Sequence, residues 1–151
     1  MKKALLLFAL TAFFIMGLQG LGTAQVCTPD GAYTQPGIWP DSIQDFDTAY
    51  QCLPYTQILT VIVPVDTFAQ GVDLWIDSIV VTGIGGLPPG MTYACEPPSC
   101  GFPGGSTGCV LISGTSMTTG IYTIVAYVTT YVTMKTFPWL AISQSDTIMD
   151  Y

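Results

Sequence analysis

The side chains of this chain that could take part in catalysis or bonding are its acids and its cysteines. There are ten Asp and Glu residues and five cysteines, but no histidine. A Ser/His/Asp or Cys/His catalytic arrangement needs a base of near-neutral pKa, which histidine normally supplies. Lys135, the one Lys or Arg beyond the first three residues, is a poor substitute.

Carboxylates alone can hydrolyse glycosidic bonds if two of them flank the bond. The sequence offers three pairs: Asp45 with Asp47, Asp66 with Asp73, and Asp73 with Asp77. On a strand, Asp73 and Asp77 would lie about 13 Å apart, beyond the separation that either glycosidase class uses. Asp45 and Asp47 are closer but fall in an irregular segment. Solvated surface acids explain all of these, so we predict no catalytic residue and no enzyme.

The cysteines are Cys27, Cys52, Cys95, Cys100 and Cys109. The spacing Cys95-x4-Cys100-x8-Cys109 does not match the paired C-x2-C knuckles of zinc sites, so we expect disulfides, no metal and no cofactor. The sequence leaves the pairing open. A bridge within the Cys95–Cys109 loop is the expected first bond, because that loop has few apolar residues to hold it.

Aromatic side chains offer a surface for stacking sugars, and a neutral carbohydrate suits a chain with so few cations. The set is Trp39, Trp75, Trp139, Tyr93, Phe102, Tyr127 and Tyr131. The alternative places Trp75 in the core and lets Trp39 pack an N-terminal segment down. Tyr127 and Tyr131 lie four apart on a strand face expected to be wet, although they could also pack against Thr neighbours across strands. We take Tyr127, Tyr131 and Trp139 as the candidate ligand aromatics.

These residues lie on segments that are typical of strands. Alternating or continuous β-branched and aromatic runs predict strands over Tyr55–Val65, Leu74–Thr82, Met91–Cys95, Cys109–Ser113 and Ile121–Met134. Asp66–Gly71 reads as a loop. Gly83–Gly90, with four glycines and two prolines, predicts a turn that cannot continue a strand. Asp41–Tyr50 is the one weak helical candidate, and we expect it to be a loop.

The long strand Ile121–Met134 has a clear period of two. Its core-facing side chains are expected to be Tyr122, Ile124, Ala126, Val128 and Val132. The solvent face should hold Thr123, Val125, Tyr127, Thr129, Tyr131 and Thr133. With glycines at short intervals and no helical periodicity, the chain is predicted to be an all-β antiparallel sandwich with a disulfide-stapled loop.

The first residues are typical of a signal peptide. Lys2 and Lys3 precede the apolar run Ala4–Leu18, and Gly22-Thr23-Ala24 predicts cleavage before Gln25. A lipid anchor on Cys27 and an N-terminal membrane anchor are the alternatives. We therefore expect residues 1–24 to be a signal peptide, 25–54 a Pro/Gly-rich lead-in segment with an edge strand, and 55–151 the sandwich, with no stable membrane span after cleavage.

Removing residues 1–24 leaves Lys135 against all ten acids, a net charge of 1 − 10 = −9. Such a chain cannot neutralise phosphates, so nucleic acid is excluded as a partner. Attraction to an anionic membrane surface is excluded for the same reason.

Three motifs resemble a known family. Gly86-Leu-Pro-Pro-Gly90, Ile112-Ser-Gly-Thr115 and Gly120-Ile-Tyr122 resemble the immunoglobulin-like (cadherin-like) repeats of bacterial surface proteins. More narrowly, the chain is similar to short exported proteins of gram-negative bacteria that use type IX secretion. That similarity rests on Cys27–Asp30, Pro36–Asp41, Asp77–Thr82, Thr92–Cys95, Phe102–Ser106 and Gly108–Cys109.

The resemblance implies an immunoglobulin-like sandwich that is secreted or held at the cell surface. It implies a non-catalytic role in adhesion or in surface or extracellular assembly, with a protein or glycan partner; the alternative is a carbohydrate-binding module using exposed aromatics. Cys52 lies outside the matching motifs and is therefore expected to be the odd cysteine. Calcium is not implied, because Val128–Met134 lacks the acidic residues that cadherin-like repeats place there.

Proteins of that group carry one more strand and a C-terminal sorting domain. Here Ile148–Tyr151 resembles the start of that strand. We therefore expect either that the chain is a fragment whose sandwich lacks its last strand, or that the sandwich closes with a short or borrowed strand. An unfinished sheet would leave an open edge that pairs with another chain.

Overall fold

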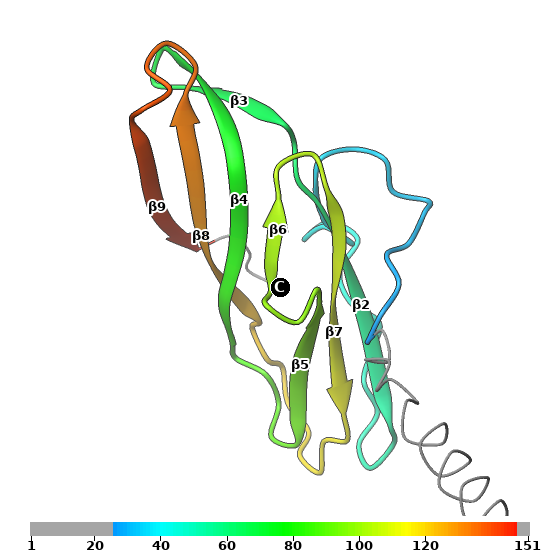
Figure 1. The fold of residues 1–151 in the computed structure, drawn as a ribbon. Coiled ribbons are helices and arrows are strands. Elements are labelled where there is room, and N and C mark those ends of the chain that lie inside the picture. Colours follow the sequence, from blue (N-terminus) through cyan, green and yellow to red (C-terminus); the bar gives the residue numbers. More distant parts are fainter. Residues whose placement is uncertain (1–25, 148–151) are drawn as a thin grey trace, which may run out of the picture.

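Two antiparallel sheets packed face to face make up the computed structural model, which describes residues 26–147 (Figure 1). One sheet has the strand order β1-β2-β7-β5, and we call it sheet A. The other, sheet B, has the order β3-β4-β8-β9, and β6 also pairs with β4. No helix occurs among the described residues. The expected all-β sandwich is confirmed at this level.

The strand bounds differ in detail from the expected ones. The strands are β1 (Gly37–Trp39), β2 (Tyr55–Ile62), β3 (Asp66–Ala69), β4 (Val72–Gly85), β5 (Met91–Glu96), β6 (Gly101–Pro103), β7 (Thr107–Gly114), β8 (Val125–Met134) and β9 (Ala141–Thr147). The weak helical candidate Asp41–Tyr50 is turn and irregular structure, as expected.

The core is one cluster between the two sheets. Its buried members are Leu59, Val61, Val63, Cys95, Val110 and Ile112 on the sheet A side, and Ile76, Val81, Phe102 and Val128 on the sheet B side. Most of them alternate along their strands, as inward-facing residues of a sandwich do. The β-branched runs seen in the sequence therefore supply the two inner faces.

Sheet A is covered on its outer side by the lead-in segment. Thr60 on β2 is buried although it points away from the core, and its Oγ1 accepts a hydrogen bond of 2.8 Å from the Asp30 backbone N–H. Cys109, opposite Thr60 on β7, is bonded to Cys27. This cover explains why β2 is apolar on both faces.

The loop from Cys95 to Cys109 is more ordered than its composition indicates. It contains β6, and Phe102 on that strand is completely buried in the core. A Cβ at Gly108 would lie 2.5 Å from the Phe102 ring, so the backbone of β7 must carry glycine there to admit it. The interpretation of Phe102 as a ligand aromatic is therefore wrong.

Two segments expected to be irregular are strands. Asp66–Ala69 forms β3, paired with the first residues of β4. Gly83–Gly85 continues β4, because the Tyr127 ring lies over the glycines: a Cβ at Gly85 would sit 3.2 Å from Tyr127 Cε2. An aromatic ring that covers glycines across a strand pair restores the missing side-chain packing. The turn begins only at Gly86, which has a φ of 75°.

The two faces of β8 follow the expected alternation. Ala126 and Val128 are buried, whereas Tyr127 and Tyr131 are exposed. The strand begins at Val125 rather than Ile121. The expected inner and outer faces are therefore confirmed, and the expected start is wrong by four residues.

Trp75 lies on the outer face of sheet B and is 44% exposed, so the interpretation that placed it in the core is wrong. The cause is a β-bulge between Ile76 and Ser78, where Asp77 is the extra residue. One extra residue reverses the alternation, so Ile76, Ile79 and Val81 can all face the core while Trp75 faces solvent.

The last described strand, β9, was not expected from the sequence. It pairs antiparallel with β8 from Tyr127↔Thr147 to Thr133↔Ala141. The expected strand start at Ile148–Tyr151 and the expected signal peptide at residues 1–24 lie outside the described residues. Within residues 26–147, no helix has the length and apolarity needed to span a membrane.

Candidate functional site

Four of the five cysteines are joined in two disulfides. Cys27 is bonded to Cys109, 82 residues away, and Cys95 to Cys100, five residues away. Cys52 is a free, exposed thiol in the irregular segment before β2. Paired cysteines of this kind indicate an oxidising, extracellular type of environment.

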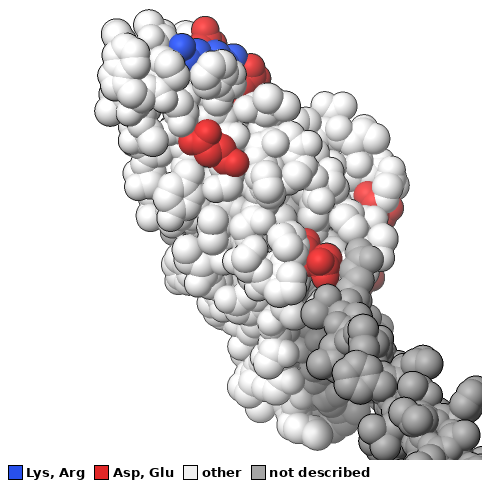
Figure 2. Space-filling view, in the orientation of Figure 1, with Lys and Arg blue, Asp and Glu red and all other residues white. Residues whose placement is uncertain are grey.

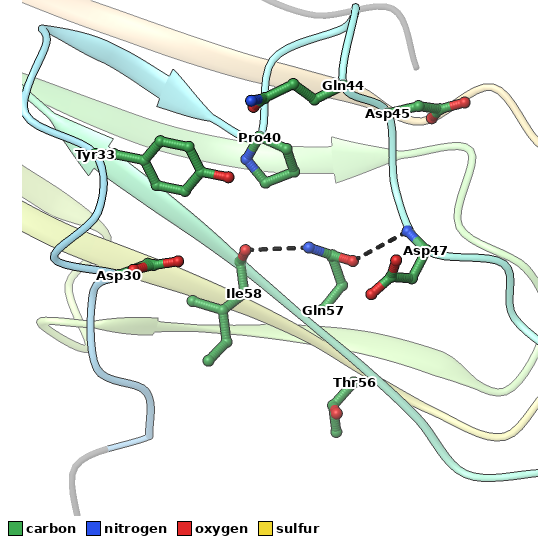
Figure 3. Close-up of a pocket in the computed structure, with 9 residues that line it drawn as sticks. All are labelled: Asp30, Tyr33, Pro40, Gln44, Asp45, Asp47, Thr56, Gln57 and Ile58. Carbon is green, nitrogen blue, oxygen red and sulfur yellow. Dashed lines mark hydrogen bonds between the residues drawn. The ribbon is translucent and has the colours of Figure 1, made fainter.

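A hollow lies between the lead-in segment and β2 (Figure 3). Its volume is about 580 Å³. It is lined by Asp30, Tyr33, Pro40, Gln44, Asp45, Asp47, Thr56, Gln57 and Ile58. Figure 3 shows Asp45 and Asp47 along one side and Asp30 and Tyr33 on the other.

Hydrogen bonds between side chains and the backbone hold this hollow in shape. Gln57 Oε1 accepts from the Asp47 N–H at 3.3 Å, and Gln57 Nε2 donates to the Ile58 carbonyl at 3.2 Å. Asp30 Oδ1 accepts from the Ala32 N–H at 2.9 Å. The carboxylates thus serve as turn acceptors as well as lining groups. Across residues 26–147, no three His, Cys, Asp or Glu side chains gather as a metal-ligand set.

Tyr55, at the start of β2, interacts electrostatically with the acids of this segment, Asp45 and Asp47. Burial raises the pKa of its phenol above 10.0, and the negative charges of Asp47 and Asp45 raise it further. Its hydroxyl donates to Gln57 Oε1 at 3.3 Å. The phenol is protonated at neutral pH, as that of any tyrosine is, and it can therefore donate this hydrogen bond.

A second surface is the outer side of sheet B, where three aromatic rings are about half exposed. Trp75 on β4 and Tyr131 on β8 are each 44% exposed, and Tyr127 on β8 is 48% exposed. Pairing places all three on one face, because Trp75 lies opposite Thr133 and Tyr131 opposite Ser78. We call Trp75, Tyr127 and Tyr131 the aromatic face.

Polar side chains surround the aromatic face. Thr133 Oγ1 donates to Asp77 Oδ2 at 2.7 Å, and Thr129 and Ser145 share a hydroxyl hydrogen bond of 3.1 Å. Lys135 forms an ion pair with Asp66 at the far end of the same sheet. Both members of that pair are partly exposed, so the pair contributes little to stability.

A third surface lies at one end of sheet B, where the β3–β4 and β8–β9 turns come together (Figure 1). Exposed apolar side chains gather there: Phe68, Phe137, Trp139, Leu140 and Ile142, which we call the distal end. Phe137 and Trp139 meet edge to face, with ring centroids 5.5 Å apart and planes at 64°. The backbone joins the two turns, since the Lys135 N–H donates to the Asp73 carbonyl at 3.1 Å.

The candidate ligand aromatics from the sequence fall on two different surfaces. Tyr127 and Tyr131 belong to the aromatic face, whereas Trp139, 79% exposed, belongs to the distal end. The sequence left Trp75 open between the ligand aromatics and the core; the one signal for its true position was Asp77, a charged residue inside an apolar strand.

The remaining aromatics have structural roles. Trp39 stacks on Tyr33 with ring centroids 5.2 Å apart, and its Nε1 donates to the Gln35 carbonyl at 2.9 Å. Tyr93 on β5 packs against the core. Trp39 therefore fixes the lead-in segment, as its alternative interpretation stated.

Charge is sparse on the face shown in Figure 2. Its blue side chain is Lys135, the single Lys or Arg in residues 26–147, and acidic side chains lie near it. Most of the visible surface is uncharged. Phosphate-bearing ligands therefore find no cluster of cations on the described part of the chain.

In comparisons with known proteins, no family model, no curated protein and no solved structure matches the chain.

Proposed function

We propose that this chain is an exported, non-catalytic module with an immunoglobulin-like sandwich, acting in adhesion or in assembly at the cell surface. The distal end is the observation that carries the proposal. Phe137 and Trp139 are large apolar side chains held in solvent at the tip of a rigid sheet. Exposed aromatic patches of this kind are typical of surfaces that bind other molecules.

Export is supported from two directions. The sequence of residues 1–24 has the charged, apolar and small-residue regions of a signal peptide. The two disulfides belong to an oxidising compartment, which an exported chain enters. An exported protein reaches the cell surface or its surroundings, where adhesion or assembly takes place.

Binding to intact cells of the producing species tests the proposal. We expect oxidised, fluorescently labelled protein beginning at Gln25 to bind these cells saturably. The double variant Phe137→Ser, Trp139→Ser removes both rings from the distal end, and we expect it to bind about tenfold or more weakly. Because both side chains are exposed, the variant should keep the wild-type circular dichroism spectrum.

Tyr50→Ser is the matched control, since Tyr50 is exposed in the lead-in segment, away from both turns of sheet B. We expect this variant to bind as the wild type does. Equal binding by the wild type and the distal-end double variant, or no saturable binding by either, contradicts the proposed function.

The hollow of Figure 3 supplies the test of the non-catalytic part, because it holds the acids Asp45 and Asp47. We expect the purified protein to show no glycosidase turnover on a substrate panel. Turnover that disappears in Asp47→Asn but persists in the control Asp73→Asn, on β4, would show the hollow to be an active site.

A further inference from the structure

The three rings of the aromatic face form a bent line on sheet B: Trp75 on β4 is diagonal to Tyr131 on β8, and Tyr127 follows Tyr131 along β8. Trp75 is opposite Thr133, and Tyr131 lies two residues before Thr133 on β8. Diagonal neighbours on one face of a sheet are about 7–8 Å apart, within reach of aromatic side chains. Tyr127 lies four residues further along β8, about 13 Å away at the usual rise of a strand. The line suits an extended ligand better than a small, compact one.

The groups beside these rings are mainly hydroxyls. Thr133 and Asp77 are joined at 2.7 Å, and Thr129 and Ser145 at 3.1 Å. Ser78 and Ser143 stand opposite Tyr131 on its two sides. Hydroxyls both donate and accept hydrogen bonds, so they match a ligand that is itself rich in hydroxyls. Aromatic rings meanwhile stack on the apolar faces of such a ligand.

The charge of this face selects against anions. Asp66, Asp73 and Asp77 lie on or beside it, and Lys135 is already paired with Asp66. A carboxylated, sulfated or phosphorylated chain would meet these carboxylates without a free cation to offset them, at least on the described part of the molecule. The ligand that fits is uncharged.

We propose that the aromatic face binds a polysaccharide built of neutral sugars, with Trp75 and Tyr131 as its central stacking rings. The site is distinct from the distal end, so it adds a ligand to the module and does not depend on the contact proposed for Phe137 and Trp139. Tyr127 extends the line of stacking along β8 and at the same time covers Gly83 and Gly85.

Affinity electrophoresis of the oxidised protein tests this inference. Native gels would contain either a neutral polysaccharide, from a panel of soluble β-glucans, xylans and mannans, or an anionic one such as alginate. We expect at least one neutral polysaccharide to retard the protein and alginate to leave its mobility unchanged. Trp75→Ala and Tyr131→Ala should each weaken binding by about tenfold, the loss of one stacking ring.

Two variants separate stacking from other effects. Tyr131→Phe keeps the ring and should bind as the wild type does, whereas Trp139→Ala removes an exposed tryptophan elsewhere and should also bind normally. Tryptophan fluorescence gives a second readout, because the chain has only three tryptophans. With Trp39 and Trp139 replaced by Phe, Trp75 is the reporter, and its emission should shift to the blue when the polysaccharide covers it.

The inference is overturned if no neutral polysaccharide binds, if alginate binds in preference, or if Trp75→Ala and Tyr131→Ala bind like the wild type. Trp75→Ala could also lose cell binding while no neutral polysaccharide competes with the wild type for that binding. This result would assign the aromatic face to a protein partner and overturn the inference too. Cell binding that depends on Phe137 and Trp139 alone would leave the proposed function standing without this inference.

Discussion

Tyr55 is the residue at which the fold most clearly changes an acid–base equilibrium. Burial, and then the charges of Asp47 and Asp45, raise its pKa above the ordinary 10.0. The native state therefore holds this proton more tightly than the unfolded chain does. The resulting stabilisation is complete below pH 10.0 and is lost as the pH rises through the folded-state pKa.

We expect the free energy of unfolding to fall above about pH 10, and Tyr55→Phe to remove part of that fall. Urea unfolding followed by circular dichroism across this alkaline range measures both curves. Tyr50→Phe, at an exposed position, should retain the whole decline. Parallel curves for the wild type and Tyr55→Phe would show that Tyr55 makes no such contribution.

Single residues also show where sequence reasoning succeeds. Alternation along an uninterrupted strand correctly placed Ala126 and Val128 inward and Tyr127 and Tyr131 outward. Alternation carried through β4 would not place Trp75, because the bulge at Asp77 adds one residue and exchanges the two faces. A bulge depends on pairing with a partner strand, so the local sequence does not reveal it.

The two disulfides act on very different lengths of chain. Cys27–Cys109 spans 82 residues and ties the lead-in segment to sheet A, while Cys95–Cys100 spans five. By loop-closure entropy, the first contributes about 4.5 kcal/mol and the second about 2 kcal/mol. We expect Cys27→Ser with Cys109→Ser to lower the unfolding free energy roughly twice as much as Cys95→Ser with Cys100→Ser does.

Denaturant titration of the two double variants gives the comparison. A larger loss for the Cys95/Cys100 variant would mean that this short bridge holds β6 and Phe102 in the core, and that chain entropy is the smaller effect.

Among residues 26–147, β9 is one of the two ends of the strand order of sheet B and lies beside β8. The Met134 N–H donates to the Leu140 carbonyl, so alternation turns the backbone groups of Ala141, Ser143 and Ser145 away from β8. No Pro or Lys protects Ala141–Thr147. This is the edge at which we expect pairing with another chain.

We expect concentration-dependent self-association in sedimentation velocity that Ser143→Pro weakens, because proline removes an outward N–H without disturbing the bonds to β8. Ser143→Ala keeps that N–H and should associate normally. Association that is absent, or unaffected by proline, would count against this edge as the pairing site.

At the level of elements, the sequence predicted the class of fold and the strands β2, β4, β5, β7 and β8, but it missed β3, β6 and β9. Asp66–Ala69 looks like a loop because its side chains are exposed and its pairing is supplied by β4. Phe102 was hidden in a Gly/Pro-rich loop, and its burial depends on the space left by Gly108. Ala141–Thr147 is polar and is held by its ladder with β8. Strands that form because a neighbouring strand pairs with them show little hydrophobic periodicity in their own sequence.

At the scale of the whole molecule, the important feature for binding is how acidic, aromatic and apolar side chains are distributed over the surface. Acidic side chains lie on the lead-in segment and near Lys135, with Asp66, Asp73 and Asp77 on or beside the aromatic face, and the apolar distal end lies at one end of sheet B. The aromatic face and the distal end, both on sheet B, are therefore open to contact on a protein whose other sheet is covered by its own lead-in segment.

A surface or extracellular role requires that the folded, oxidised protein lie outside the cytoplasm, and thiol labelling of intact cells measures this directly. A membrane-impermeant maleimide should label producing cells at Cys52 alone, because the other four cysteines are bonded. Cys52→Ser should abolish the label, and reduction under denaturing conditions should reveal all five thiols of the wild type. Labelling that appears only after the cells are lysed, or reaches all five cysteines without reductant, would contradict the account.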